Sequence, residues 1–139
     1  MDPTLDVTGL ERHEIRSDAD VVRVRQRARV LATGARLSLV DQTKMVTAVS
    51  ELARNTLIHG GGGHAELATV SDGRRSGVAA TFADAGPGIP DLDQALTDGW
   101  SSGSGMGLGL SGARRLVDDF TLDSAPGQGT TVRIVKWAR

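Results

Sequence analysis

The chain of 139 residues is long enough for one ordinary domain with a hydrophobic core and too short for two. Its 16 basic and 17 acidic residues leave a formal charge of −1, and only 3% of its residues are aromatic, so the composition argues against a nucleic-acid partner. Cysteine is absent, which excludes disulfides and cysteine-ligated metals and fits a reducing compartment. No apolar run approaches the roughly 18 residues of a membrane span. We therefore expect a single cytoplasmic domain over residues 1–139, without a nucleic-acid or membrane partner.

Hydrophobic periodicity predicts three long helices and a short one. Apolar residues recur at helical spacing after Ser17, a good N-cap, and again along a stripe that contains Met45, Val49, Leu52 and Thr56. The predicted helices span residues 18–33, about 41–59, 92–99 and 108–120.

The remaining patterned segments predict five strands, at residues 10–16, 65–72, 76–85, 120–125 and 130–138. The first strand is expected at an edge of the sheet, and a tight turn joins the last two. The predicted sheet is therefore mixed and largely antiparallel. With its helices packed on one face, the expected fold class is an α+β two-layer sandwich.

Residues 102–112 read SGSGMGLGLSG, and each glycine costs about 0.5–1 kcal/mol of ordering relative to alanine. The stretch contains G-x-G-x-x-G, but a dinucleotide-binding fingerprint needs a strand directly before it and a parallel βαβ unit. Here a polar loop precedes it, and the next strand returns through a tight turn. A flexible surface loop is the other explanation. The stretch leads into the N-terminus of a predicted helix, which is a natural anion site, so we expect a different kind of phosphate-binding backbone.

Three further segments contain polar residues or glycine turns that bear on function. Glu51, Asn55 and His59 lie at i, i+4 and i+8, which places them on one face of the second long helix. In "DAGPGIPD" a predicted strand ends at Asp84 and turns through two glycines, and "GQGTTV" at 127–132 follows the third helix and its strand.

Glu-x-x-x-Asn on a helix, Asp-x-Gly-x-Gly, the glycine-rich stretch and Gly-Thr-Thr occur in this order. They closely resemble the four ATP-binding boxes of the GHKL ATPases, the superfamily of gyrase, Hsp90, histidine kinases and anti-sigma-factor kinases. The resemblance covers the chain from about residue 41 to its end. The short chain and the segments "ELARN", "GPGIPD", "DGWSS" and "IVKWAR" are most similar to the RsbT-type stressosome switch kinases.

The resemblance implies a serine/threonine protein kinase that uses ATP and Mg²⁺, phosphorylates STAS-domain proteins and activates a PP2C-type phosphatase. It implies that Glu51 is the general base and that Asn55 binds Mg²⁺ and nucleotide. Asp84 would accept a hydrogen bond from the amino group of adenine, and guanine presents a carbonyl oxygen there, so ATP is favoured over GTP. Thr130 is expected at the adenine edge, and His59 either contacts the nucleotide or caps its helix. The other expected nucleotide contacts are Gly86, Gly88, Ile89, Gly105, Met106, Gly107, Leu108 and Gly109.

Two other functions remain open. An anti-sigma factor that sequesters a sigma factor and phosphorylates its antagonist would share all four boxes, whereas an ATP-binding adaptor without catalysis would not need Glu51. A protein partner is expected to dock beside the glycine-rich stretch, over residues 91–96, Trp100, Arg114 and Arg115. The alternative for Trp100 is that its side chain packs in the core.

Overall fold

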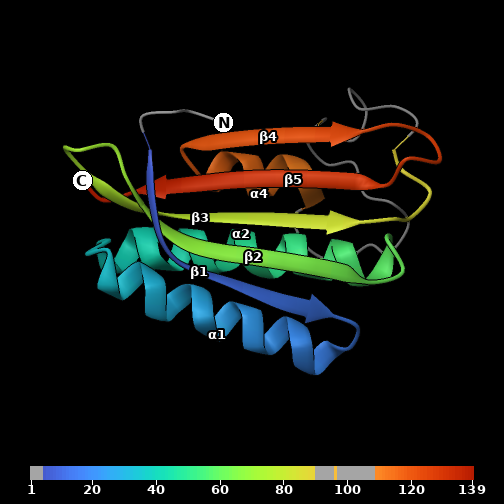
Figure 1. Ribbon diagram of the computed structural model, residues 1–139, viewed down its shortest axis with the longest axis horizontal. Coiled ribbons are helices and arrows are strands. Elements are labelled where there is room, and N and C mark those ends of the chain that lie inside the picture. The colour runs from blue at the N-terminus through green and yellow to red at the C-terminus, as the bar shows by residue number, and fades with distance from the viewer. Residues whose placement is uncertain (1–4, 90–95, 97–108) are drawn as a thin grey trace.

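A computed structural model describes residues 5–89, 96 and 109–139. Eight helices and strands follow one another there: β1 (Asp6–Ile15), α1 (Asp18–Gly34), α2 (Leu39–Ile58), β2 (Gly63–Ser71), β3 (Ser76–Asp84), α4 (Gly109–Leu116), β4 (Asp119–Ser124) and β5 (Thr130–Trp137). The strands form one five-stranded sheet in the order β1-β2-β3-β5-β4, with β1 at an edge as predicted. All three of these helices lie on the same side of the sheet (Figure 1).

The predicted α+β two-layer sandwich is confirmed. The predicted sheet was mixed and largely antiparallel, and the observed pairings are more uniform. Each of the four strand pairings is antiparallel, so the sheet formed by the described strands is antiparallel rather than mixed. The two hairpins, β2–β3 and β4–β5, meet where β3 pairs with β5.

Serine side chains start both long helices. The Ser17 Oγ accepts the N–H of Asp20 at 3.3 Å, and the Ser38 Oγ accepts the N–H of Asp41 at 3.1 Å. Each bond satisfies one of the N–H groups that lack a partner in the first turn of a helix. Because Ser38 is the cap, α2 begins at Leu39, two residues earlier than the sequence pattern predicted.

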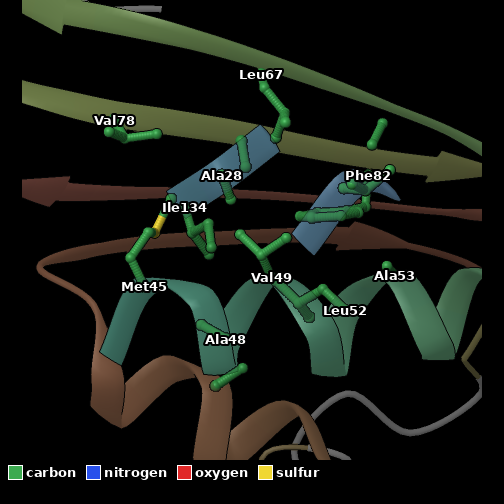
Figure 2. Close-up of a cluster of buried hydrophobic side chains, with 14 of the residues drawn as sticks. Ala28, Met45, Ala48, Val49, Leu52, Ala53, Leu67, Val78, Phe82 and Ile134 are labelled. Atoms are coloured by element: carbon green, nitrogen blue, oxygen red, sulfur yellow. The ribbon is translucent and has the colours of Figure 1, made fainter. Parts of the chain in front are cut away.

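The core lies between the three described helices and the sheet, and α2 supplies many of its side chains. Figure 2 shows side chains from the predicted stripe, among them Met45, Val49 and Leu52, directed toward Phe82 and Ile134 of the sheet. These five side chains are at most 2% exposed. Burying a side chain of this size contributes about 1.5–3 kcal/mol. The stripe therefore fixes the rotation of α2 about its axis and turns its polar motif away from the core.

The third long helix is shorter than predicted. The pattern indicated a helix to residue 120, but α4 ends at Leu116 and β4 begins at Asp119. Of the two residues between them, Asp118 is bound by the sheet. Its N–H donates to Val135 O at 3.0 Å, and its carboxylate accepts the N–H of Trp137 at 2.7 Å. Helical periodicity continues through Val117, so the local sequence does not show where the helix stops.

At the N-terminus, the first strand is longer than the predicted residues 10–16. It starts at Asp6 and pairs with β2 through an irregularity between Thr8 and Glu11. Gly9 lies within that irregularity with a φ of 63°. The predicted short helix at 92–99 falls outside the described residues, apart from Leu96. None of the described helices is long and apolar enough to cross a bilayer.

Candidate nucleotide site

Four strands begin or end side by side at one end of the sheet. The register places Gly63 of β2 beside Asp84 of β3, Asp84 beside Thr130 of β5, and Thr130 beside Ser124 of β4. Asp84 and Thr130, which are 46 residues apart in sequence, thus become direct neighbours in the sheet. We call the end of the sheet marked by Gly63, Asp84, Ser124 and Thr130 the site end.

The side chain of Asp84 is held by a tight turn at the end of β3. Its Oδ1 accepts the N–H of Gly86 at 2.9 Å. A Cβ on Gly60 would overlap the Asp84 carboxyl group, and a Cβ on Gly86 would lie 2.8 Å from the Cα of Gly60. Real Cβ atoms do not approach so closely, so both glycines are needed to keep the Asp84 side chain where it is. Sequence analysis did not single out Gly60, which lies in the "HGGGG" segment after α2.

The loop that follows Asp84 is docked on the β4–β5 turn. The N–H of Gly127 donates to Pro87 O at 2.7 Å, and the N–H of Ile89 donates to Ser124 Oγ at 2.9 Å. Ser124 Oγ also lies 2.9 Å from Thr130 Oγ1. The hydroxyl of Ser124 therefore joins two of the predicted nucleotide-binding segments. Sequence analysis missed Ser124, because a serine before a Pro-Gly turn carries no signal of its own.

Glycines with positive φ allow this loop and turn to interlock. Gly88 has a φ of 78°, and a Cβ there would overlap the carbonyl oxygen of Ala125. Gly129 has a φ of 76°, and a Cβ there would overlap the carbonyl oxygen of Asp84. Gly127 has a φ of 75° but nothing within 4 Å of its Cβ position. Gly88 and Gly129 are thus constrained by contact as well as by conformation.

Glu51 faces the N-terminus of α4. Its Oε1 accepts the N–H of Gly109, the first residue of α4, at 3.0 Å. The first N–H groups of a helix and its dipole favour an anion at this point, and here a carboxylate lies there. The structure therefore brings the Glu-x-x-x-Asn motif to Gly109 of the glycine-rich stretch, where α4 begins.

Asn55 and His59 follow on α2. Asn55 is half-buried, one turn after Glu51, and its carbonyl oxygen accepts the N–H of His59 at 2.9 Å. His59 is exposed and forms the C-cap of α2, which is one of the two roles expected from the sequence. The amide side chain of Asn55 supplies one oxygen of the kind that Mg²⁺ prefers.

Part of the predicted site lies outside the described residues. Those positions are Trp100, Gly105, Met106, Gly107 and Leu108. Arg114 and Arg115 are exposed on α4. No group of three or more His, Asp or Glu side chains within the described ranges could hold a metal ion by itself. The donor set fits an ion that reaches the protein together with phosphate oxygens and waters.

Comparison with known proteins identifies the family. Residues 40–138 match the family of histidine kinase-, DNA gyrase B- and HSP90-like ATPases. The chain belongs to this family. The matched residues run from the start of α2 through β5, so they include every described part of the candidate site.

Individual relatives are consistent with this membership. The chain is 40% identical over 125 residues to the serine/threonine-protein kinase RsbT of Bacillus subtilis, across 90% of this chain and 94% of the relative. It is 31% identical over 103 residues to the anti-sigma F factor of Bacillus licheniformis, across 69% of each chain. The predicted resemblance to GHKL ATPases and RsbT-type kinases is confirmed.

A solved structure supports the fold. The RsbU and RsbW domains of Rv1364c from Mycobacterium tuberculosis align with a TM-score of 0.64 and 20% identity over 95% of this chain. This chain spans 33% of that one. At this identity the likeness bears on the fold and not on the activity.

Proposed function

We propose that the chain is an ATP-dependent serine/threonine protein kinase that acts as a partner-switching regulator. The contact between Glu51 and the N–H of Gly109 carries the proposal, because it puts a carboxylate where a helix N-terminus favours anions. The 40% identity to the serine/threonine-protein kinase RsbT supports the same activity. The single-domain interpretation of residues 1–139 is part of the proposal.

In the proposed reaction, Glu51 is the general base. The hydroxyl of a substrate serine or threonine loses its proton to the Glu51 carboxylate as its oxygen forms a bond to the γ-phosphorus of ATP. The bond from that phosphorus to the bridging oxygen breaks, and ADP leaves with the electron pair. Asn55 would offer its amide oxygen to Mg²⁺, which when bound neutralises charge on the phosphates.

Asp84 is the proposed determinant of base selectivity. Its Oδ1 already accepts one backbone N–H, and a carboxylate has lone pairs left for the amino group of adenine. Gly86 and Gly88 would let the base lie against the backbone, with Ile89 and Thr130 at its edge. The phosphates would meet the glycine-rich stretch and those N-terminal N–H groups of α4 that Glu51 does not occupy. His59 is kept as a further proposed nucleotide contact.

The proposed partners are a STAS-domain protein as the phosphorylated substrate and a PP2C-type phosphatase that the released kinase activates. Both would dock over residues 91–96, Trp100, Arg114 and Arg115, so that they compete. We propose the cytoplasm as the location, because ATP and such partners are available there. The anti-sigma F factor relatives at about 30% identity favour one second candidate, in which the chain sequesters a sigma factor.

A phosphotransfer assay with radiolabelled ATP and Mg²⁺ tests the proposal. The purified chain is mixed with STAS-domain proteins and sigma factors of its own organism, and transfer and complex formation are measured. Glu51→Gln should lower transfer by about 100-fold or more, since the base is lost, and should leave ATP affinity within about twofold. Glu66→Gln is the matched control, because Glu66 lies in β2 between the core residues Ala65 and Leu67 and is therefore on the sheet face opposite the helices.

Three results would decide against parts of the proposal. Full transfer by Glu51→Gln would remove the assignment of the base. Tight binding of a sigma factor, with no STAS-domain protein bound or phosphorylated, would favour the anti-sigma factor. ATP binding without transfer to any of these proteins would favour the adaptor.

A further inference from the structure

Helices α1 and α2 pack side by side in the helix layer (Figure 1). Between them a groove of about 550 Å³ opens to solvent. We call it the α1–α2 groove, and its lining residues are Arg25, Gln26, Arg29, Val30, Thr33 and Val46. Its volume is within the range of sites that bind ligands or side chains of a partner.

Apolar side chains are exposed along this groove. Val30 lines it and is 53% exposed. Leu39 is 73% exposed and lies seven residues before Val46, hence on the same face of α2. Val22, 38% exposed, likewise shares a face of α1 with the groove residue Gln26. The groove is therefore flanked by exposed apolar side chains, and exposed apolar surface of this kind is a feature of interaction sites on soluble proteins.

The arginines of α1 divide into two groups. Arg23 and Arg27 each bind a carboxylate, at 2.8 Å and 3.0 Å. Arg25 and Arg29 line the groove, and within the described ranges no carboxylate forms an ion pair with either of them. Arg29 binds only a glutamine amide oxygen, at 3.4 Å. The positive charge of the groove is therefore left uncompensated, whereas the charge beside it is neutralised.

We propose that the α1–α2 groove binds an acidic amphipathic helix of a partner protein. Apolar residues of that helix, spaced at i, i+4 and i+7, would cover the exposed Val30 and Leu39 and contact Val46, which is 8% exposed. Its carboxylates would bind Arg25 and Arg29 through charge-assisted hydrogen bonds. A second copy of this chain fits less well, because two such grooves would bring like charges together.

The groove and the nucleotide site lie on different sides of α2. Val46 and Glu51 are five residues apart in α2, which is about 140° around the helix axis. A partner helix and a nucleotide can therefore bind at the same time. The groove proposal does not rest on kinase activity.

Two synthetic peptides provide the test. Both are 21-residue helices with leucine at the apolar positions, one with glutamate and the other with lysine at the flanking positions. Amide NMR spectra of the labelled chain should shift at groove residues with the glutamate peptide only. The double variant Arg25→Glu/Arg29→Glu should weaken the glutamate peptide by about tenfold or more and strengthen the lysine peptide. The double variant Arg12→Glu/Arg74→Glu reverses two exposed charges outside the groove, so it is the charge-matched control and should change neither.

Other outcomes would overturn the proposal. Equal binding of the two peptides, or shifts that map elsewhere, would mean that the groove does not select an acidic helix. Equally tight binding of polyglutamate would indicate a site for polyanions without a need for apolar contact. A concentration-dependent dimer, seen by sedimentation together with changes at groove residues, would assign the groove to a second copy. Glu51→Gln should bind the glutamate peptide normally, so failure of the kinase proposal and failure of the groove proposal are distinguishable.

Discussion

The two ends of the sheet hold their carboxylates in different ways. At the end opposite the site, Asp41 and Asp118 surround Lys136, whose Nζ lies 3.6 Å and 3.5 Å from their oxygens and whose side chain is 5% exposed. At the site end, Asp84 and Glu51 accept backbone N–H groups of glycines at 2.9 Å and 3.0 Å. Carboxylates of the first kind are neutralised by a buried cation, so loss of that cation is costly. Those of the second kind keep lone pairs and charge available for a ligand, which suits them to binding and proton transfer.

The largest expected effect comes from breaking the cation-paired end. Lys136→Met removes the buried cation between Asp41 and Asp118 and leaves them the exposed Arg139 as an ion-pair partner, so it should lower the free energy of unfolding by about 3 kcal/mol. The exposed Lys44, the only other lysine, provides the control, and Lys44→Met should change stability by less than about 0.5 kcal/mol. Urea unfolding measures both. ATP affinity of the folded Lys136→Met protein should be unchanged, and its loss would show that the two ends are not independent.

A pair of glycine variants disturbs the site end in a controlled way. Gly127→Ala and Gly129→Ala both place a Cβ at positive φ, which costs about 1–2 kcal/mol. Only the Cβ at Gly129 overlaps the carbonyl oxygen of Asp84. Gly129→Ala should therefore lose about 1 kcal/mol more and should also lose ATP binding, while Gly127→Ala keeps it. Thermal unfolding and calorimetry compare the two, and equal losses would mean that the contact with Asp84 does not matter.

Much of the fold could be predicted from the sequence, because its signals are local. The stripe through Met45 and Leu52 predicted the buried face of α2, and the turn residues predicted both hairpins. The end of α4 could not be predicted. Asp118 lies outside the helix because it binds the backbone of β5. Its carboxylate accepts the N–H of a residue 19 positions later in the chain, and no local sequence pattern indicates such a contact.

The two ends also differ in how far sequence predicted them. The site end contains glycine-rich turns and a Glu-x-x-x-Asn motif, so most of it could be recognised in the sequence. The role of Ser124 could not. The opposite end depends on Asp41 and Lys136, which are 95 residues apart and of ordinary type. Charge pairs of this kind become visible only when the fold brings them together.

A variant of Asp84 tests whether the carboxylate at the site end is available for a ligand. Asp84→Asn replaces an acceptor-only carboxylate by an amide that can present its N–H₂ group to the base. Loss of a hydrogen bond to a charged group is worth about 1.5–3 kcal/mol, so ATP affinity should fall by about 10- to 100-fold and the preference over GTP should shrink. Asp123→Asn, exposed on β4, is the control. Calorimetry that gives equal ATP and GTP affinities for the unmodified chain would contradict the assignment of Asp84.

The smallest expected effect comes from Glu11→Gln. This variant tests whether a cation stabilises a carboxylate that lies away from both ends of the sheet. Arg27 donates hydrogen bonds to Glu11 at the edge of the sheet, and this lowers the Glu11 pKa from 4.5 to about 2. Because the pKa is lowered in the folded state, the stability it supplies is present above pH 4.5 and is lost as the pH falls toward 2. With allowance for solvent screening, the contribution is about 1 kcal/mol. Urea unfolding should show Glu11→Gln less stable than the unmodified chain at pH 6, with the gap narrowing at pH 3. A gap of equal size at both pH values would mean that the ionised carboxylate adds nothing beyond a neutral hydrogen bond.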